Sequence, residues 1–209
     1  MTSAVHESAG VDLTDVGHVL RSALVVGVTQ TVLITATAYA TRALGGGAEA
    51  LLVGVLVGVA ILVTAFIPGL RTRARTIEGI AGAAGIGLAA TVVFLILDVA
   101  LLQPLGVWTN RWHAIGGGSN WWYHPVFWMV GTYLAWMGAW ILANQARRSG
   151  EPALGAAAVT ALVATLVAGV VAVLIRFPGA GWNVPTFGVA ALAGLPLAVL
   201  LTSRGRRSA

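Results

Sequence analysis

The amino-acid sequence predicts an all-α fold: a polytopic integral membrane protein with six transmembrane helices and with both the N and C termini cytoplasmic. Hydrophobic residues make up 58% of the 209 residues and charged residues only 9%. Soluble domains carry about 25% charged residues, so this chain has too few charges to cover a water-facing surface. Six apolar runs approach or exceed the roughly 20 residues that cross a bilayer. They are continuous rather than alternating, which favours helices over the strands of a barrel.

The expected spans divide the chain into a transmembrane domain at 19–203 and two tails. Residues 1–18 are mixed and polar, with no basic residue before Arg21, so we expect a cytoplasmic tail and no cleavable signal peptide. A basic cytoplasmic tail follows at 204–209, and an aromatic outer loop is expected at 104–124. The predicted spans are 19–41, 50–68, 77–102, 126–146, 153–175 and 184–201.

The orientation is predicted from the arginines, which are the only basic side chains apart from histidine. Cytoplasmic loops of membrane proteins are enriched in arginine and lysine. With both termini cytoplasmic, nine arginines fall on the cytoplasmic side and three on the other, and the aromatic loop lies outside. The nine are Arg21, Arg71, Arg73, Arg75, Arg147, Arg148, Arg204, Arg206 and Arg207, and the three are Arg42, Arg111 and Arg176.

The first span carries an unusual number of polar residues. Gln30, Thr37 and Thr41 share one face at helical spacing. A glutamine this deep should face protein, where its amide can be hydrogen-bonded. We interpret this face as a helix–helix contact in preference to a transport path.

Small residues predict where helices approach closely. Gly54 and Gly58 form a small-xxx-small pair in the second span. In the fourth span, Gly131, Ala135 and Ala139 repeat every four residues, with Gly138 close by, and this face is expected to be a packing groove. Pro196 is expected to kink the last span.

Asp98 is the only acidic residue well inside a predicted span. An acidic residue in a span is by default a functional hypothesis. The alternative is a structural partnership with Arg111 or with an amide of the loop. The sequence leaves both interpretations open.

The strongest candidate site is the aromatic loop together with the start of the fourth span. Seven of the eight tryptophans lie within the 33 residues from Trp108 to Trp140. An interfacial belt readily accounts for two or three of them. For all seven, an interfacial belt alone and a ligand or partner surface are the two interpretations that remain open. The expected contact residues are Trp108, Arg111, Trp112, His113, Asn120, Trp121, Trp122, Tyr123, His124, Trp128 and Trp136.

Two missing residue types exclude several cofactors. The chain has no cysteine, which excludes an iron–sulfur cluster, a thiolate metal site and covalently attached haem. It has no lysine, which excludes a retinal Schiff base and a Walker nucleotide loop. Its arginines are spread singly or in twos and threes between apolar runs, which favours lipid phosphate over nucleic acid as their partner.

A metal site is a weaker hypothesis. His113, His124 and Asp98 offer imidazole and carboxylate ligands for copper, iron or zinc. Their spacing matches no ligand motif, and three glycines at 116–118 separate the two histidines.

These observations favour a non-catalytic subunit over an enzyme. We expect it to dock to other membrane protein subunits through the Trp-rich outer loop, and to hold a lipid, a quinone or a pigment there. A transporter of small molecules or ions, using Gln30 and Asp98, is the first alternative. A metal-dependent membrane enzyme is the second. The expected location is the cell membrane of a bacterium or archaeon.

Overall fold

The computed structural model describes residues 13–107 and 123–203, and nearly all of them are helical. Six helices are long and apolar enough to cross a membrane, as the sequence predicts. A short π-helix, η1 (Asp98–Leu102), continues the third of them without a break. The helices are α1 (Val16–Ala43), α2 (Gly46–Arg71), α3 (Ile77–Leu97), α5 (Tyr123–Ser149), α6 (Leu154–Leu174) and α7 (Val184–Ser203).

Several helices extend beyond their predicted ends. Helix α1 begins at Val16 because the side chain of Asp15 caps it, accepting a hydrogen bond of 2.9 Å from the backbone N–H of His18. Helix α2 continues past Pro68 to Arg71. Pro68 has no N–H to donate, but its carbonyl accepts the N–H of Thr72 at 3.0 Å. The last turn of α2 is therefore hydrogen-bonded beyond the proline.

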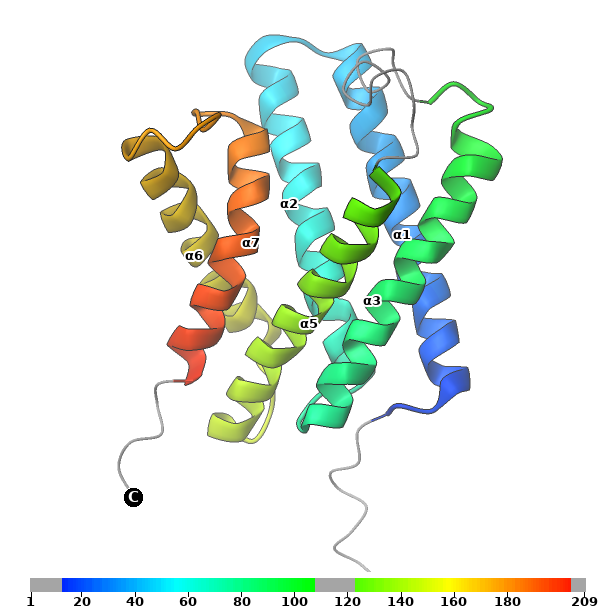
Figure 1. Ribbon diagram of the computed structural model, residues 1–209, viewed down its shortest axis with the longest axis vertical. Helices are drawn as coiled ribbons and strands as arrows, with labels where there is room; N and C mark the ends of the chain where they lie inside the picture. The colour runs from blue at the N-terminus through cyan, green and yellow to red at the C-terminus, as the bar shows by residue number, and fades with distance from the viewer. Residues whose placement is uncertain (1–12, 108–122, 204–209) are drawn as a thin grey trace, which may run out of the picture.

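The six helices run alternately up and down, and the bundle therefore has two distinct ends (Figure 1). One end carries the connection between α2 and α3, with Arg71, Arg73 and Arg75. It also carries the last turn of α5, with Arg147 and Arg148. We call it the arginine end; α1 begins and α7 ends there. The opposite end carries the α1–α2 and α6–α7 connections and η1, and we call it the loop end.

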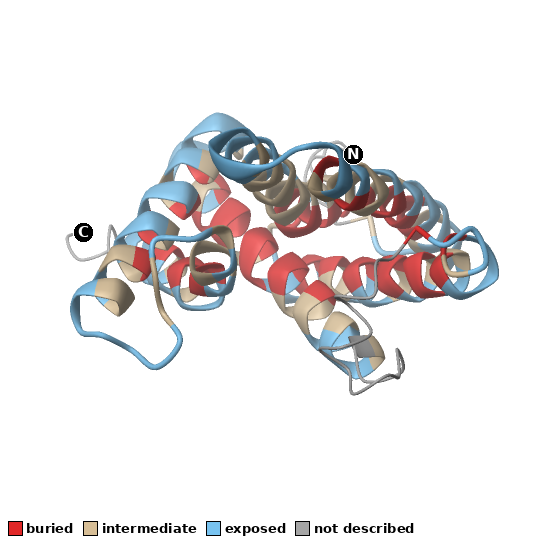
Figure 2. Ribbon diagram, turned by 90° about the horizontal axis from the view of Figure 1, so that it is seen from above, coloured by how far each residue is buried: buried red, intermediate tan, exposed pale blue. Residues whose placement is uncertain are grey.

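Helices α1, α2, α3 and α5 form a ring in which each packs against its two neighbours. Helices α6 and α7 pack mainly against each other, and α7 joins this hairpin to α5. Viewed along the bundle, the buried residues face its interior and the exposed ones face outward, as expected for helices surrounded by lipid (Figure 2).

The close-packed face of α5 is confirmed. A methyl group at Gly138 would collide with the carbonyl of Ala65 on α2, and one at Gly131 would collide with the hydroxyl of Thr91 on α3. Ala139 lies against Gly69 of α2 in the same way. These contacts bring the helix backbones together in the half of the ring nearer the arginine end and at its middle.

The predicted packing role of Gly54 and Gly58 is wrong. A methyl group at Gly58 would meet nothing within 4 Å, and one at Gly54 would meet only a methyl of Val184 at 3.6 Å. Both glycines instead line a groove of about 400 Å³ between α2 and the α6–α7 hairpin. The hairpin packs more extensively against α5 than against α2, and this leaves open space beside these two glycines.

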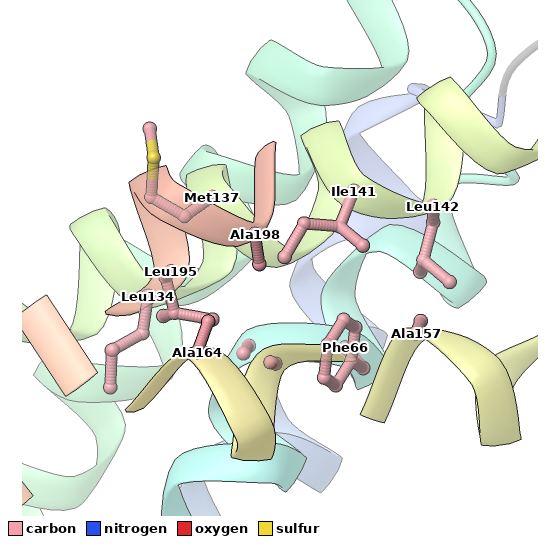
Figure 3. Packing of buried hydrophobic residues seen from close by; sticks show 11 residues of the cluster. Phe66, Leu134, Met137, Ile141, Leu142, Ala157, Ala164, Leu195 and Ala198 are labelled. Atoms are coloured by element: carbon pink, nitrogen blue, oxygen red, sulfur yellow. The ribbon is translucent and has the colours of Figure 1, made fainter. Parts of the chain in front are cut away.

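Apolar side chains of α2, α5, α6 and α7 fill the space where the hairpin meets the ring (Figure 3). Phe66 from α2 and Leu142 from α5 are almost completely buried there, as is Leu195 from α7. This cluster fixes the hairpin to the ring.

Side-chain hydrogen bonds also join α5 to α7. Asn144 donates to Thr202 Oγ1 at 3.2 Å near the arginine end. The hydroxyl of Tyr133 donates to the carbonyl of Leu192 at 2.6 Å. Helix α7 runs through Pro196 as a single helix, and Pro196 lies four residues after Leu192. The proline therefore leaves this carbonyl without its usual helical donor, and Tyr133 supplies one.

Candidate functional site

A cavity of about 360 Å³ lies inside the ring of α1, α2, α3 and α5. On α1 its lining extends from Gln30 to Thr41, which is about 16 Å along the helix at 1.5 Å per residue. On α5 it extends from Val126 to Leu134. The cavity therefore reaches from the middle of the bundle towards the loop end.

Gln30 lies in the wall of this cavity, near its deeper limit. Its side chain is only 7% exposed, and its Nε2 donates to Thr64 Oγ1 on α2 at 2.9 Å. The prediction that this amide faces protein and is hydrogen-bonded is confirmed. Within the described part of the chain, nothing donates a hydrogen bond to its Oε1.

The polar face predicted on the first span follows the cavity. Thr37 and Thr41 line it together with Gln30. Only Gln30 makes the expected polar contact with another helix. Thr37 and Thr41 donate their hydroxyl hydrogens at 2.8 Å to carbonyls of their own helix, those of Leu33 and Ala38.

Two further threonines in the wall behave in the same way. The hydroxyl of Thr64 donates to the carbonyl of Ala60 at 2.7 Å, and that of Thr91 donates to the carbonyl of Gly87 at 2.9 Å. Each of the four threonine hydroxyls in the wall thus has its hydrogen engaged, and its oxygen still has lone pairs.

The remaining wall is apolar. Phe94 of α3 and Phe127 of α5 stack with their ring centroids 5.2 Å apart. Within residues 13–107 and 123–203, the cavity lining contains no Asp, Glu, Lys, Arg or His; it consists of Gln30, Ile34, Thr37, Ala38, Thr41, Val57, Ala60, Ile61, Thr64, Thr91, Phe94, Val126, Phe127, Val130, Gly131 and Leu134.

The inner limit of the cavity is closed by backbone packing. Gly87 of α3 lies against Ala135 of α5, and Gly138 of α5 lies against Ala65 of α2. Gly27 of α1 lies against the carbonyl of Ala90 on α3. No side chain can move aside to open these contacts, because the helix backbones themselves form them.

Asp98 occupies a different position from the cavity. It is 0% exposed at the first residue of η1, and its Oδ2 accepts a hydrogen bond of 2.8 Å from Gln103 Nε2. The backbone carbonyl of Asp98 accepts the N–H of Gln103 at 2.9 Å. Gln103 thus contacts both the carboxylate and the last turn of the π-helix. The amide partner agrees with the structural interpretation of Asp98, whereas the π-helical turn was not predicted.

The tryptophans of α5 also lie apart from the cavity. Trp128 is 46% exposed and Trp136 is 41% exposed. The ring of Trp136 lies beside that of Trp140, with centroids 6.0 Å apart. His124 lies in the first turn of α5 and is half-buried. None of these three predicted contact residues, Trp128, Trp136 and His124, lines the cavity, whereas Gln30 does.

The rest of the predicted contact surface lies outside the described residues. This applies to Trp108, Arg111, Trp112, His113, Asn120, Trp121 and Trp122, and to the side chain of Tyr123. The metal hypothesis needs His113 and is therefore untested. Within residues 13–107 and 123–203, no group of three or more His, Cys, Asp or Glu could hold a metal ion.

Sequence reasoning missed the wall residues contributed by α2, α3 and α5. Thr64, Thr91 and Phe127 each carried a signal, since polar or aromatic residues inside a span tend to face protein. What the sequence lacked was the pairing of helices that brings these residues to the same cavity as Gln30.

No protein-family model, curated protein or solved structure matches the chain. The features of the structure that bear on function are the cavity, the aromatic surface and the charges at the two ends of the bundle.

Proposed function

We propose that the protein is a non-catalytic membrane subunit that holds one amphipathic molecule, such as a lipid, quinone or pigment, in the cavity of the ring. The observation that carries this proposal is an apolar cavity of about 360 Å³ with a line of polar groups along one wall. Ligand sites of this size are mostly apolar, and a few placed polar groups orient the ligand. The described part of the lining carries no ionisable group, which supports binding rather than acid–base catalysis.

A transporter is the second candidate, because Gln30 brings an amide near the middle of the bundle, where transporters bind their substrates. Passage through the protein would require the backbone contacts at Gly87, Gly138 and Gly27 to separate. Close backbone packing of this kind stabilises one arrangement of helices, which favours holding a molecule over moving it.

Filling the cavity tests the proposal. Ala60 lines the cavity on α2, and Ala60→Phe would occupy part of its volume. Val55 is exposed on the same helix outside the cavity, so Val55→Phe is the control. We expect wild type and Val55→Phe to co-purify with an amphipathic molecule near one per chain, measured by native mass spectrometry in mild detergent. Ala60→Phe should retain at least about tenfold less, equivalent to about 1.4 kcal/mol of binding free energy.

The melting temperature of each variant separates loss of the molecule from loss of the fold. If Ala60→Phe melts like Val55→Phe and still carries the molecule at the wild-type ratio, the cavity is not the binding site.

We further propose that the Trp-rich outer loop docks this subunit to another membrane protein, in the cell membrane of a bacterium or archaeon. Two observations support docking: the concentration of tryptophan between Trp108 and Trp140, and the exposed indoles of Trp128 and Trp136 on α5. Tryptophan is enriched at protein interfaces, where it combines a large apolar area with one hydrogen-bond donor.

Replacing Trp121 and Trp122 together by alanine tests docking. Burial of one tryptophan against a partner is worth a few kcal/mol at roughly 25 cal/mol per Å², so the double variant should lose a partner well over tenfold in affinity. Membrane insertion should be unchanged because all six apolar spans remain. The measurement is quantitative co-purification from the native membrane, and an unchanged set of partners would return these tryptophans to the role of an interfacial belt.

A further inference from the structure

We propose that the cavity selects a molecule that donates a hydrogen bond, namely an uncharged apolar compound with a hydroxyl group, over the corresponding ketone or carboxylate. This inference rests on the proposed holding function and specifies the chemistry of the molecule held. It follows from counting which donors and acceptors the cavity wall still offers.

The wall offers mainly acceptors. The hydroxyl hydrogens of Thr37, Thr41, Thr64 and Thr91 are all donated to carbonyls within their own helices. A threonine oxygen in this state can only accept. Gln30 Oε1 is a further acceptor to which no described residue donates.

The wall offers one donor. Gln30 Nε2 carries two hydrogens, and one of them is donated to Thr64 Oγ1. The identity of this amide nitrogen follows from the network, because Thr64 gives its own hydrogen to Ala60 and must accept from its other neighbour. The second N–H of Gln30 is the single side-chain donor left among the lining residues that the structure describes.

This inventory discriminates between functional groups. A hydroxyl group on the bound molecule can donate to any of several acceptors in the wall and can accept from Gln30. A ketone can only accept, so it can use only the Gln30 N–H and leaves the acceptors without a donor. Because failure to pair a buried polar group is costly, we expect a preference of about tenfold for the hydroxyl, equivalent to about 1.4 kcal/mol.

Charge discriminates more strongly. Among the described residues, the lining has no cationic side chain to compensate a carboxylate or a phosphate. Transfer of an uncompensated anion into an apolar site is far more costly than transfer of a hydroxyl. An anionic lipid headgroup is therefore excluded from the cavity itself, and only an uncharged polar group fits against the threonines.

Three probes with matched chains test the selection: n-decanol, 2-decanone and decanoate. Their dissociation constants are obtained from the rise in melting temperature of detergent-purified protein with probe concentration. The wild type is compared with the double variant Thr37→Val and Thr41→Val, which removes two acceptors while keeping the shape of the wall. Because every probe partitions into detergent, the measured quantity is the ratio of its dissociation constants for variant and wild type.

Thr29→Val is the matched control. Thr29 lies on the same helix, outside the cavity, and its hydroxyl donates to the carbonyl of Val25 at 2.8 Å in the same manner as Thr37. We expect wild type and Thr29→Val to bind decanol about tenfold more tightly than decanone, with decanoate weakest. In the double variant two of the acceptors are removed while Thr64, Thr91 and Gln30 Oε1 remain, so the preference for decanol should fall measurably below that of wild type while decanone binding persists.

The outcomes separate this inference from the proposed function. If decanol and decanone bind the wild type equally, or if the double variant keeps the preference, the selection for a hydroxyl is wrong and the holding function stands. If Thr29→Val loses the preference as the double variant does, the selection is also wrong. If no probe binds wild type more tightly than Ala60→Phe, the holding function fails as well.

Two sources could supply such a molecule, a quinol ring or an aliphatic alcohol, and both donate from a hydroxyl. Mass spectrometry of the molecule extracted from the wild-type protein distinguishes an aromatic diol from an aliphatic alcohol, and either one supports the selection. A fatty acid or a phospholipid present in wild type and absent from Ala60→Phe would overturn it.

Discussion

At the scale of single residues, the protein compensates for a proline in α7 with a hydroxyl from α5. Pro196 has no N–H, so the carbonyl of Leu192 has no donor within its helix. Inside a lipid bilayer, no water is available to donate a hydrogen bond to such a carbonyl. Tyr133 donates to it at 2.6 Å, and this bond ties the hairpin to the ring.

A double-mutant cycle tests this compensation. Tyr133→Phe should lower the free energy of unfolding by about 1–2 kcal/mol, because it leaves the Leu192 carbonyl unpaired. In the background of Pro196→Ala, which restores a backbone donor, the same substitution should cost much less. The measurement is thermal or denaturant unfolding of the four proteins of the cycle in one detergent. Equal costs in the two backgrounds would show that the hydroxyl does not serve the proline.

Asp98 illustrates a residue for which the sequence predicted the kind of partner, an amide beyond the span, but not the turn that brings the two side chains together. The apolar run at 77–102 predicted that Asp98 lies inside a span. Its contact with Gln103 depends on the π-helical turn, in which the chain closes a hydrogen bond over five residues. No periodicity in the sequence predicts such a turn.

At the scale of helices, glycine has two opposite uses in this protein. On α5, Gly131 and Gly138 let backbones approach α3 and α2. On α2, Gly58 faces open space and leaves a groove. The same residue type therefore has different energetic consequences on different helices.

Substitution by alanine separates the two uses. Gly138→Ala should force α5 away from α2, because the added methyl group would overlap the carbonyl of Ala65, and we expect a loss of at least about 2 kcal/mol. Gly58→Ala should be neutral or slightly stabilising, since a methyl group there meets nothing within 4 Å and alanine favours the helix. Melting temperatures of the two variants in the same detergent provide the comparison. A large loss at Gly58 together with tolerance at Gly138 would contradict this packing.

The helices were predictable from sequence because the apolar runs are long and continuous. The glycine and alanine spacing of α5 correctly indicated close packing, yet the equivalent spacing of Gly54 and Gly58 did not. The difference lies in the partner: α5 has neighbours on several sides, whereas this face of α2 meets only the splayed hairpin. Spacing reveals that a face is smooth, and only the tertiary arrangement reveals what lies against it.

The cavity was predictable only in part for the same reason. Gln30, Thr37 and Thr41 share a face that periodicity identifies. Their separation from the facing helices depends on relative tilt, which the sequence does not encode in any local pattern. The face was therefore interpreted as a contact between helices, although most of it borders a cavity.

At the scale of the whole molecule, the two ends of the bundle differ in charge. At the arginine end, guanidinium groups donate to backbone carbonyls: Arg147 to Arg75 at 3.3 Å and Arg148 to Leu201 at 3.4 Å. At the loop end, Arg42 donates to the carbonyl of Gly106 at 2.5 Å. The excess of arginine at one end predicts which end faces the cytoplasm.

Labelling of single cysteines tests this orientation. The chain has no cysteine, so Ser119→Cys and Ser208→Cys each create a single reactive thiol. In intact cells, an impermeant thiol reagent should label Ser119→Cys, and should label Ser208→Cys only after the cells are lysed. Labelling of Ser208→Cys alone in intact cells would reverse the orientation.

The division into a four-helix ring and a terminal hairpin has a consequence for biogenesis. Domains form in order of synthesis, from the N-terminus onwards. The described walls of the cavity belong to α1, α2, α3 and α5, which all precede α6 and α7 in the order of synthesis. Under the proposed function, the ring can therefore enclose its molecule before the hairpin, which is synthesised last, packs against it.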